Sequence, residues 1–193
     1  MKAIRIIQDE HRSLAAVLHG LQYLVRSIRF HLAEPDFALF HAILNYIEVV
    51  PERFHHPKED RYLFRLLRER VPASAALLDR LQEDHRVGAD KVRRLSQALA
   101  RYEQEGEEAF ATFATLVGDY AAFEWNHMQR EEADVLPLAK QFLTRSDWEA
   151  IDAAFTDHTD PLFGATAVDE CNELFRRIVQ LAPPPLGTDA SIS

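Results

Sequence analysis

Apolar residues recur three or four positions apart along most of the chain, which is the spacing that places side chains on one face of a helix. Near the N-terminus one such stripe comprises Ile4, Ile7, His11, Leu14, Leu18, Leu21, Val25 and Ile28. A second clear stripe comprises Leu77, Leu81, His85, Gly88, Val92, Leu95, Leu99 and Tyr102. Both stripes carry a histidine in the middle. The pattern predicts long helices that each bury a polar side chain on an otherwise apolar face.

Breaks in this pattern divide the chain into four long helical segments and two shorter ones. Proline, glycine or short polar residues interrupt the spacing at about residues 33–36, 70–72, 106, 144–147 and 157–164. We expect the first long helix before the first break, and further long helices over about residues 36–69, 73–105 and 107–143. The shorter helices are expected over about residues 146–155 and 165–181.

Single residues refine two of these segments. Ser146 and Glu149 have the spacing of a capping box, so Ser146 is the expected N-cap of the fifth helix. Pro51 and Pro57 each remove a backbone donor and should bend the second long helix locally. The inward face of that helix is expected to comprise Phe40, Leu44, Ile47, His55, Glu59, Tyr62 and Leu66.

Four long helices with short connections are typical of an antiparallel up-down-up-down four-helix bundle. We therefore predict an all-α fold in which residues 1–143 form the bundle and residues 144–182 form a C-terminal helical extension packed on it. Residues 183–193 are rich in proline and are predicted to be a flexible tail. The two C-terminal helices either cover the bundle or form a homodimer contact.

Charge and composition exclude several classes of protein. The 193 residues include 22 Lys and Arg against 31 Asp and Glu, a net charge of −9, which argues against binding to nucleic acid or to an acidic membrane surface. No apolar stretch approaches the roughly 18 residues of a membrane-spanning helix. The apolar run at the N-terminus is too short for a signal-peptide core, so we expect a cytoplasmic protein. The one cysteine, Cys171, cannot form an intrachain disulfide.

Four of the nine histidines belong to a motif that occurs twice. Residues 9–12 read Asp-Glu-His-Arg and residues 83–86 read Glu-Asp-His-Arg, and each is followed at a distance by a His-x-x-x-Glu sequence. The two histidines of a half are 44 residues apart in the first half and 42 in the second. The repeat predicts two helical hairpins related by a pseudo-two-fold axis, each of which supplies two histidines and one glutamate.

Helix geometry brings these residues together. Residues four apart differ by about 40° around the axis, so the histidine and glutamate of each His-x-x-x-Glu pair point the same way. Facing helices lie roughly 8–10 Å apart, so four imidazoles and two carboxylates should converge. Two buried carboxylates are unfavourable unless cations compensate their charge. We predict a pair of metal ions, iron or manganese with zinc as an alternative, held by His11, His55, Glu59, His85, His127 and Glu131.

This order of residues on four successive helices resembles the hemerythrin-like, or HHE cation-binding, domain family over residues 1–143. The resemblance implies a non-haem di-iron centre that binds O₂ or a related small ligand such as nitric oxide or peroxide, with the same six ligands. Oxygen-carrying hemerythrins have a further histidine one turn after the third-helix histidine, where this sequence has Ala89. That departure argues against simple reversible O₂ carriage and favours sensing, peroxide or nitric-oxide chemistry, or iron holding.

Residues beside the motif have several interpretations. Glu52 and Glu124 each precede a motif histidine by three residues, and they are either acceptors of imidazole N–H groups, substitutes for the missing histidine, or solvated acids. Tyr120 is interpreted as a core tyrosine. His56 should face away because it lies about 100° around the helix from its neighbour. If Pro57 distorts the helix, His56 becomes an alternative ligand, with Asp60 as its partner.

Four functions are compatible with the sequence alone. We expect a protein that binds or senses a small ligand, rather than a dedicated enzyme, and assign no catalytic residue. The alternatives are a di-iron oxidase or peroxidase with Tyr120 or Glu124 as proton donor, iron handling without catalysis, and a structural bundle without metal. His19, His31, His41 and His158 are expected on the surface or in ordinary packing.

Overall fold

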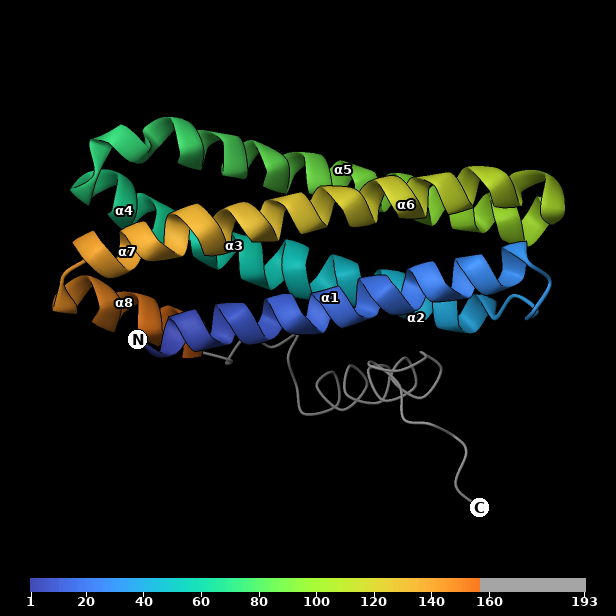
Figure 1. The fold of residues 1–193 in the computed structure, drawn as a ribbon, viewed down its shortest axis with the longest axis horizontal. Helices are drawn as coiled ribbons and strands as arrows, with labels where there is room; N and C mark the ends of the chain where they lie inside the picture. Colours follow the sequence, from blue (N-terminus) through green and yellow to red (C-terminus); the bar gives the residue numbers. More distant parts are fainter. Residues whose placement is uncertain (157–193) are drawn as a thin grey trace, which may run out of the picture.

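The structure is a computed structural model that describes residues 1–156, and these residues are all-helical with no strand among them. Long helical runs lie side by side along the longest axis of the molecule (Figure 1). The sixth helix and the tail predicted from the sequence, together with His158 and Cys171, lie outside the described residues.

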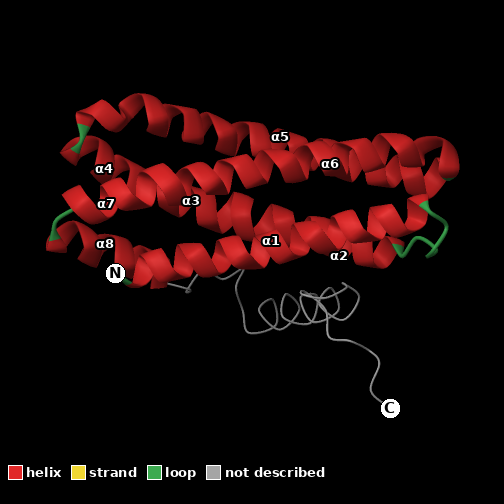
Figure 2. Ribbon diagram, viewed as in Figure 1, coloured by secondary structure: helices red, strands yellow, loops and turns green. Residues whose placement is uncertain are grey.

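The helices follow one another with few interruptions (Figure 2). In chain order they are α1 (Lys2–Arg29), α2 (Phe37–Ile47), the π-helix η1 (Glu48–His55), α3 (His56–Lys58), the π-helix η2 (Glu59–Phe64), α4 (Arg65–Arg70), the 3₁₀-helix η3 (Pro72–Ser74), α5 (Ala75–Glu105), α6 (Glu107–Arg130), the π-helix η4 (Glu131–Val135), α7 (Leu136–Phe142) and α8 (Arg145–Thr156). Residues 37–70 form one continuous run, called here the second rod, and residues 107–142 form another, the fourth rod. The first and third rods are α1 and α5.

Short connections reverse the chain between the rods (Figure 1). Gly106 alone joins α5 to α6, with a φ of 69° that favours glycine over residues with a side chain. Asp36 caps α2, because its side chain accepts a hydrogen bond of 2.9 Å from the Leu39 backbone N–H. The predicted boundaries of the long helices agree with these ends to within a few residues.

The second and fourth rods widen into π-helix where the His-x-x-x-Glu sequences lie. Proline lies in or near each π-helical segment: Pro51 is in η1, Pro57 lies two residues before η2 begins and Pro137 lies two residues after η4 ends. A proline cannot donate to the helical hydrogen-bond ladder, which explains why the regular α pattern fails at these places. The expected local distortion at Pro51 and Pro57 thus takes the form of π-helix.

The π-helical turns change which residues face inward after them. Tyr62, expected on the inward face, is 37% exposed, whereas Leu63 and Phe64 are buried. A π turn holds more residues than an α turn, so the phase of the buried stripe moves along the sequence. The prediction for Tyr62 was therefore wrong because it assumed an uninterrupted α-helix.

A layer of polar side chains divides the apolar core into two clusters. On α1, Ile7 belongs to one cluster and Leu14 to the other, with buried His11 between them. On α5, Leu81 and Val92 lie on opposite sides of buried His85 in the same way. Apolar packing therefore shields the polar layer from water along both directions of the rods.

The capping of α8 differs from the prediction. The Thr144 backbone N–H donates to Asp147 Oδ2 at 2.9 Å, and the Asp147 N–H donates to Thr144 Oγ1 at 3.3 Å. Thr144 and Asp147 thus form the reciprocal pair that was expected of Ser146 and Glu149. Asp147 also accepts two hydrogen bonds from Arg70, and this guanidinium holds the pKa of Asp147 well below its usual value.

Helix α8 packs against α1 and η2, so it covers the side of the bundle on which these two segments lie. Within residues 1–156, none of the helices combines the length and the apolar character that crossing a membrane requires.

Candidate metal centre

The structure brings together all six residues that the sequence singled out, and every rod contributes. His11 comes from α1 and His85 from α5. His55 ends η1 and Glu59 starts η2, while His127 lies in the last turn of α6 and Glu131 starts η4. All six side chains are buried. One potential ligand atom from each of His11, His55, Glu59 and Glu131 lies within 4.8 Å of the others, and the same holds for Glu59, His85, His127 and Glu131.

The two glutamates lie between two pairs of histidines. His11 Nε2 is 3.2 Å from His55 Nε2, and His85 Nε2 is likewise 3.2 Å from His127 Nε2. Glu131 directs Oε2 to His11 Nε2 at 3.2 Å and Oε1 to His127 Nε2 at 3.1 Å. Glu59 directs Oε1 to His55 Nε2 at 3.3 Å and Oε2 to His85 Nε2 at 3.7 Å. Each carboxylate thus faces both histidine pairs, one oxygen to each.

The outward nitrogens of the four histidines each face a further carboxylate. The Nδ1 atom of His55 lies 2.6 Å from Glu10 Oε2, and that of His127 lies 3.6 Å from Asp84 Oδ2. His85 Nδ1 lies 3.1 Å from Asp60 Oδ1, and His11 Nδ1 lies 3.0 Å from Glu132 Oε1. A carboxylate accepts a hydrogen from Nδ1, which leaves the Nε2 lone pair of a neutral imidazole directed toward the centre.

Sequence reasoning missed the pairing of these four acids with the motif histidines, although the acids belong to the repeated motif; Asp60 was considered only as a partner of His56. Glu10 and Asp84 immediately precede the first histidine of each half, and Asp60 and Glu132 immediately follow the two glutamates. Each acid pairs with a histidine on another rod, not with its neighbour in sequence. Their repetition in both halves was a usable signal, but their partners depend on how the rods pack.

The donor set fits a pair of cations. All four oxygens of Glu59 and Glu131 are buried and have no hydrogen-bond partner in the described part of the chain. Leaving such groups without compensation costs several kcal/mol. Two nitrogens bound to one ion at about 2.1 Å lie about 3 Å apart when their bonds are at right angles, which matches the spacing within each histidine pair. A cation beside each pair would also satisfy both carboxylates.

Without a metal the same groups hold protons. Burial opposes the protonation of His127, but Glu131 and Asp84 outweigh it and raise its pKa to about 11. Burial likewise opposes the protonation of His85, whereas Asp60 and Glu131 raise its pKa to about 9. A metal ion must therefore displace protons from these imidazoles, so metal binding should weaken as the pH falls.

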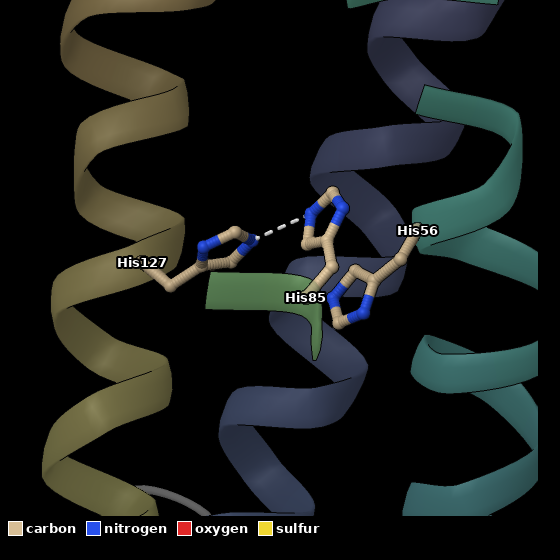
Figure 3. Close-up of side chains that lie close together, drawn as sticks. All are labelled: His56, His85 and His127. Carbon is tan, nitrogen blue, oxygen red and sulfur yellow. Dashed lines mark hydrogen bonds between the residues drawn. The ribbon is translucent and has the colours of Figure 1, made fainter. Parts of the chain in front are cut away.

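His56 faces the interior, contrary to the prediction from an ideal helix. It is 4% exposed, and its ring stacks on that of His85 with a centroid separation of 4.1 Å and an angle of 8°. Figure 3 shows its ring beside those of His85 and His127. The distortion around Pro57 that would redirect His56 is present as π-helix, but its expected partner Asp60 pairs with His85 instead.

Glu52 and Glu124, each three residues before a motif histidine, lie beside Gly88; Glu124 is buried and Glu52 is partly buried. Side chains lie so close there that a Cβ on Gly88 would be 3.0 Å from Glu52 Oε1 and 3.5 Å from Glu124 Oε1. Glu124 is fully buried, with neither oxygen hydrogen-bonded among the described residues, so its interpretation as a solvated acid was wrong. Burial and the charge of Glu124 raise the pKa of Glu52 to about 8. Glu52 Oε2 lies 3.5 Å from His56 Nδ1.

Other side chains around this layer agree with their sequence interpretation. Tyr120 is a buried core residue, and burial together with the charge of Glu124 raises its pKa well above the usual value. His19, His31 and His41 are exposed and lie outside the centre. Ala89, at the position of the additional hemerythrin histidine, lines a pocket of about 440 Å³ that Glu52 also borders.

Comparison with known proteins agrees with this geometry. A search of curated proteins found no match. The family model described as the hemerythrin HHE cation binding domain matches residues 2–139, which include the first three rods, most of the fourth and all six converging residues. The chain therefore belongs to the hemerythrin HHE cation-binding domain family.

Proposed function

We propose that this protein holds a non-haem di-iron centre and uses it to bind or sense O₂ or a related small ligand such as nitric oxide or peroxide. The family match supports metal binding, and the buried groups of histidines and glutamates support its location. The observation that carries the proposal is the arrangement of Glu59 and Glu131, whose oxygens face both histidine pairs and have no hydrogen-bond partner among the described residues.

The proposed ligand assignment follows the two histidine pairs. His11 and His55 would hold one ion, His85 and His127 would hold the other, and Glu59 and Glu131 would bridge the two. Mixed imidazole and carboxylate donors suit iron and manganese, with zinc as the remaining alternative. As part of the same proposal, the rods form an antiparallel up-down-up-down four-helix bundle, which agrees with the reversals of the chain in Figure 1.

Bound iron would supply open coordination positions and redox chemistry for the small ligand. The chain itself would contribute orientation and shielding. The four outer acids hold the imidazoles with Nε2 toward the ions, and such outer partners typically change metal affinity by roughly 10- to 100-fold. The apolar clusters on either side of the polar layer keep bulk water away from the bound ligand.

A second function, a di-iron oxidase or peroxidase, is favoured by one observation. Glu124 and Tyr120 are both fully buried, and burial raises the pKa of each side chain above its usual value. A protonated carboxyl or phenol in such a position can serve as a proton donor. Iron handling without catalysis would instead require reversible loading and release of the ions.

Adding O₂ or nitric oxide to the anaerobically reduced, iron-loaded protein is expected to give a new absorption spectrum that persists and saturates at one ligand per iron pair. Persistence is expected because the centre is buried between apolar clusters. Stopped-flow absorption spectroscopy checks this. The matched controls are the His127→Ala variant, which should lose the signal, and the exposed His41→Ala variant, which should keep it.

Three other outcomes would overturn this proposal. Rapid decay of the spectrum with multiple turnovers of peroxide or an electron donor would favour the oxidase or peroxidase. Release of iron on reduction, with no ligand spectrum, would favour iron handling. An unchanged ligand spectrum in His127→Ala would contradict the assignment of the site.

A further inference from the structure

We propose that the end of the rods opposite α8 carries a second binding site, which takes a small organic amine with an apolar body. A pocket of about 610 Å³ lies there, between the connection from α1 to α2 and the turn from α5 to α6. Figure 1 shows both connections at the same end of the rods. Pockets of this size typically hold small molecules. None of the converging histidines and glutamates lines this pocket, so the site is separate from the metal centre.

Aromatic side chains form the apolar wall of the pocket. The ring of Tyr102 lies edge-on to Phe37 with a centroid separation of 5.1 Å, and it is tilted against Phe110 at 5.2 Å. All three residues line the pocket, and Phe37 and Phe110 are only partly buried. Aromatic rings of this kind can contact the apolar body of a ligand and can also attract a cation to their faces.

The hydroxyl of Tyr102 supplies a polar group within this apolar wall. Tyr102 is 4% exposed, yet its hydroxyl has no hydrogen-bond partner in the described part of the chain. Burial, and then the charges of Glu107 and Glu34, raise the pKa of Tyr102. Both carboxylates line the same pocket, so the hydroxyl is directed toward them and its hydrogen-bonding capacity is available to a ligand.

The rim of the pocket is acidic. Its charged or titratable lining residues are Glu34, Glu103, Glu107, Arg29 and His31. Three carboxylates thus face one guanidinium and one imidazole. Glu103 already pairs with a histidine at 3.0 Å, whereas Glu34 and Glu107 have no ion pair within residues 1–156. Two unpaired carboxylates beside an aromatic wall match an ammonium group on an apolar body and disfavour a ligand that carries its own carboxylate.

Helix stability alone does not account for these two acids. Glu107 lies in the first turn of α6, where a negative charge is favourable, but Glu108 occupies the same turn. Glu108 does not line the pocket, so the two residues distinguish a contribution to the helix from a contribution to the site. Glu34 lies between α1 and α2 and has no helix end of its own to stabilise.

Titration of the metal-free full chain with phenethylamine tests the site. The matched probes are 2-phenylethanol and 3-phenylpropionate, which keep the ring and carry no charge or a negative one. In ¹H–¹⁵N NMR spectra, phenethylamine should cause saturable shifts concentrated at residues 28–37 and 102–111, with a Kd of roughly 0.1–1 mM. The alcohol should bind roughly tenfold more weakly because it lacks the charge, and 3-phenylpropionate should cause no saturable shift.

Two variants and a control assign the binding to named residues. Glu107→Gln should weaken the binding of phenethylamine roughly tenfold, because it removes one of the two unpaired carboxylates. Tyr102→Phe keeps the aromatic wall and should weaken binding roughly threefold. Glu108→Gln should bind as the wild type does. Glu107 is exposed, so its substitution provides a test even if Tyr102→Phe disturbs folding.

Several results would overturn this proposal. These are an absence of saturable shifts at roughly ten times the expected Kd, equal affinity for the amine and the alcohol, shifts confined to residues away from the pocket, or the same affinity in Glu107→Gln and Glu108→Gln. The site does not depend on the proposed metal pair. Failure of the di-iron centre would therefore leave this site in place, and the reverse also holds.

Discussion

Replacing Glu131 by Gln is expected to remove the binding of both metal ions, whereas replacing a single histidine should mainly weaken one. Glu131 presents one oxygen to His11 and the other to His127, at 3.2 and 3.1 Å from their Nε2 atoms. A neutral amide keeps the shape but loses the charge and one of the two acceptor oxygens. The loss of affinity should exceed the roughly 10- to 100-fold typical of losing an outer hydrogen-bond partner.

The loss should appear in thermal stability as well as in affinity. Each ion present at about 1,000 times its dissociation constant stabilises the folded state by about 4 kcal/mol. One kcal/mol corresponds to roughly 2–4 °C in Tm for a chain of this size. Wild-type protein should therefore gain roughly 10 °C or more on loading with iron, and Glu131→Gln should gain little. Differential scanning calorimetry with and without ferrous iron measures this.

The matched control for Glu131 lies in the same π-helix. Asp134 is an exposed acid of η4, so Asp134→Asn should keep the full metal-dependent rise in Tm. His11→Ala should retain binding of the ion at His85 and His127, although more weakly. If Glu131→Gln bound either ion with wild-type affinity, the carboxylate would not connect the two sites.

The metal-free protein should become less stable as the pH rises from about 5 to about 8, and Glu52→Gln should reduce that change. Burial and the neighbouring Glu124 raise the pKa of Glu52 from 4.5 to about 8. The folded state therefore binds the proton more tightly than the unfolded state. The contribution of this proton to folding stability is fully present below the pKa of Glu52 in the unfolded chain. It is lost as the pH rises through the pKa of Glu52 in the folded protein.

The glutamine variant removes this titration and leaves the other groups in place. His85, with a pKa raised to about 9, contributes a fall in stability over partly the same pH range in both proteins. The difference between the two proteins isolates Glu52 and should reach roughly 5–10 °C in Tm at pH 8, with Glu52→Gln the more stable. Thermal unfolding followed by circular dichroism across the pH range checks this.

Glu48 provides the control for the pH effect. It lies one helical turn before Glu52 and borders the same pocket, but its side chain is 46% exposed and pairs with Arg53. The charge of Glu48 is the smallest of the named contributions to the raised pKa of Glu52, so Glu48→Gln should keep most of the wild-type dependence of Tm on pH. Equal slopes for wild-type and Glu52→Gln would mean that the Glu52 carboxyl is ionised in the folded protein at low pH, in conflict with its burial beside Glu124.

The convergence of the six motif residues could be read from the sequence because regular helix geometry governs them. His11 and His85 each occupy a position in an apolar stripe of an uninterrupted α-helix. His55 ends η1 and Glu59 starts η2, whereas His127 lies in the last turn of α6 and Glu131 starts η4, so the two residues of each pair still face the same way. Because the motif occurs in two halves, the sequence also predicted that the histidines and glutamate of one half face those of the other.

The errors arose where the chain departs from an α-helix. His56 and Tyr62 were assigned by an angle of about 100° per residue, which fails next to the π-helices of the second rod. The prolines were visible, but the kind of distortion they produce depends on how the neighbouring rods pack. Pro137 was not considered, although it follows the equivalent π-helix of the fourth rod.

The partners of the outer acids were missed for a different reason. Glu10 lies beside His11 in sequence but pairs with His55, and Asp84 lies beside His85 but faces His127. Such pairings depend on the rotation of one rod against the next, which helical periodicity alone does not determine. The same tertiary dependence applies to Glu52, which contacts His56 and not His55 as its spacing suggested.

Anomalous diffraction at the iron absorption edge from crystals of the iron-loaded protein tests the metal centre most directly. Two peaks per chain are predicted, one beside His11 and His55 and the other beside His85 and His127, with Glu59 and Glu131 between them. No peak in the polar layer at full iron saturation, or iron bound only at surface acids, would contradict the assignment of these six residues as ligands.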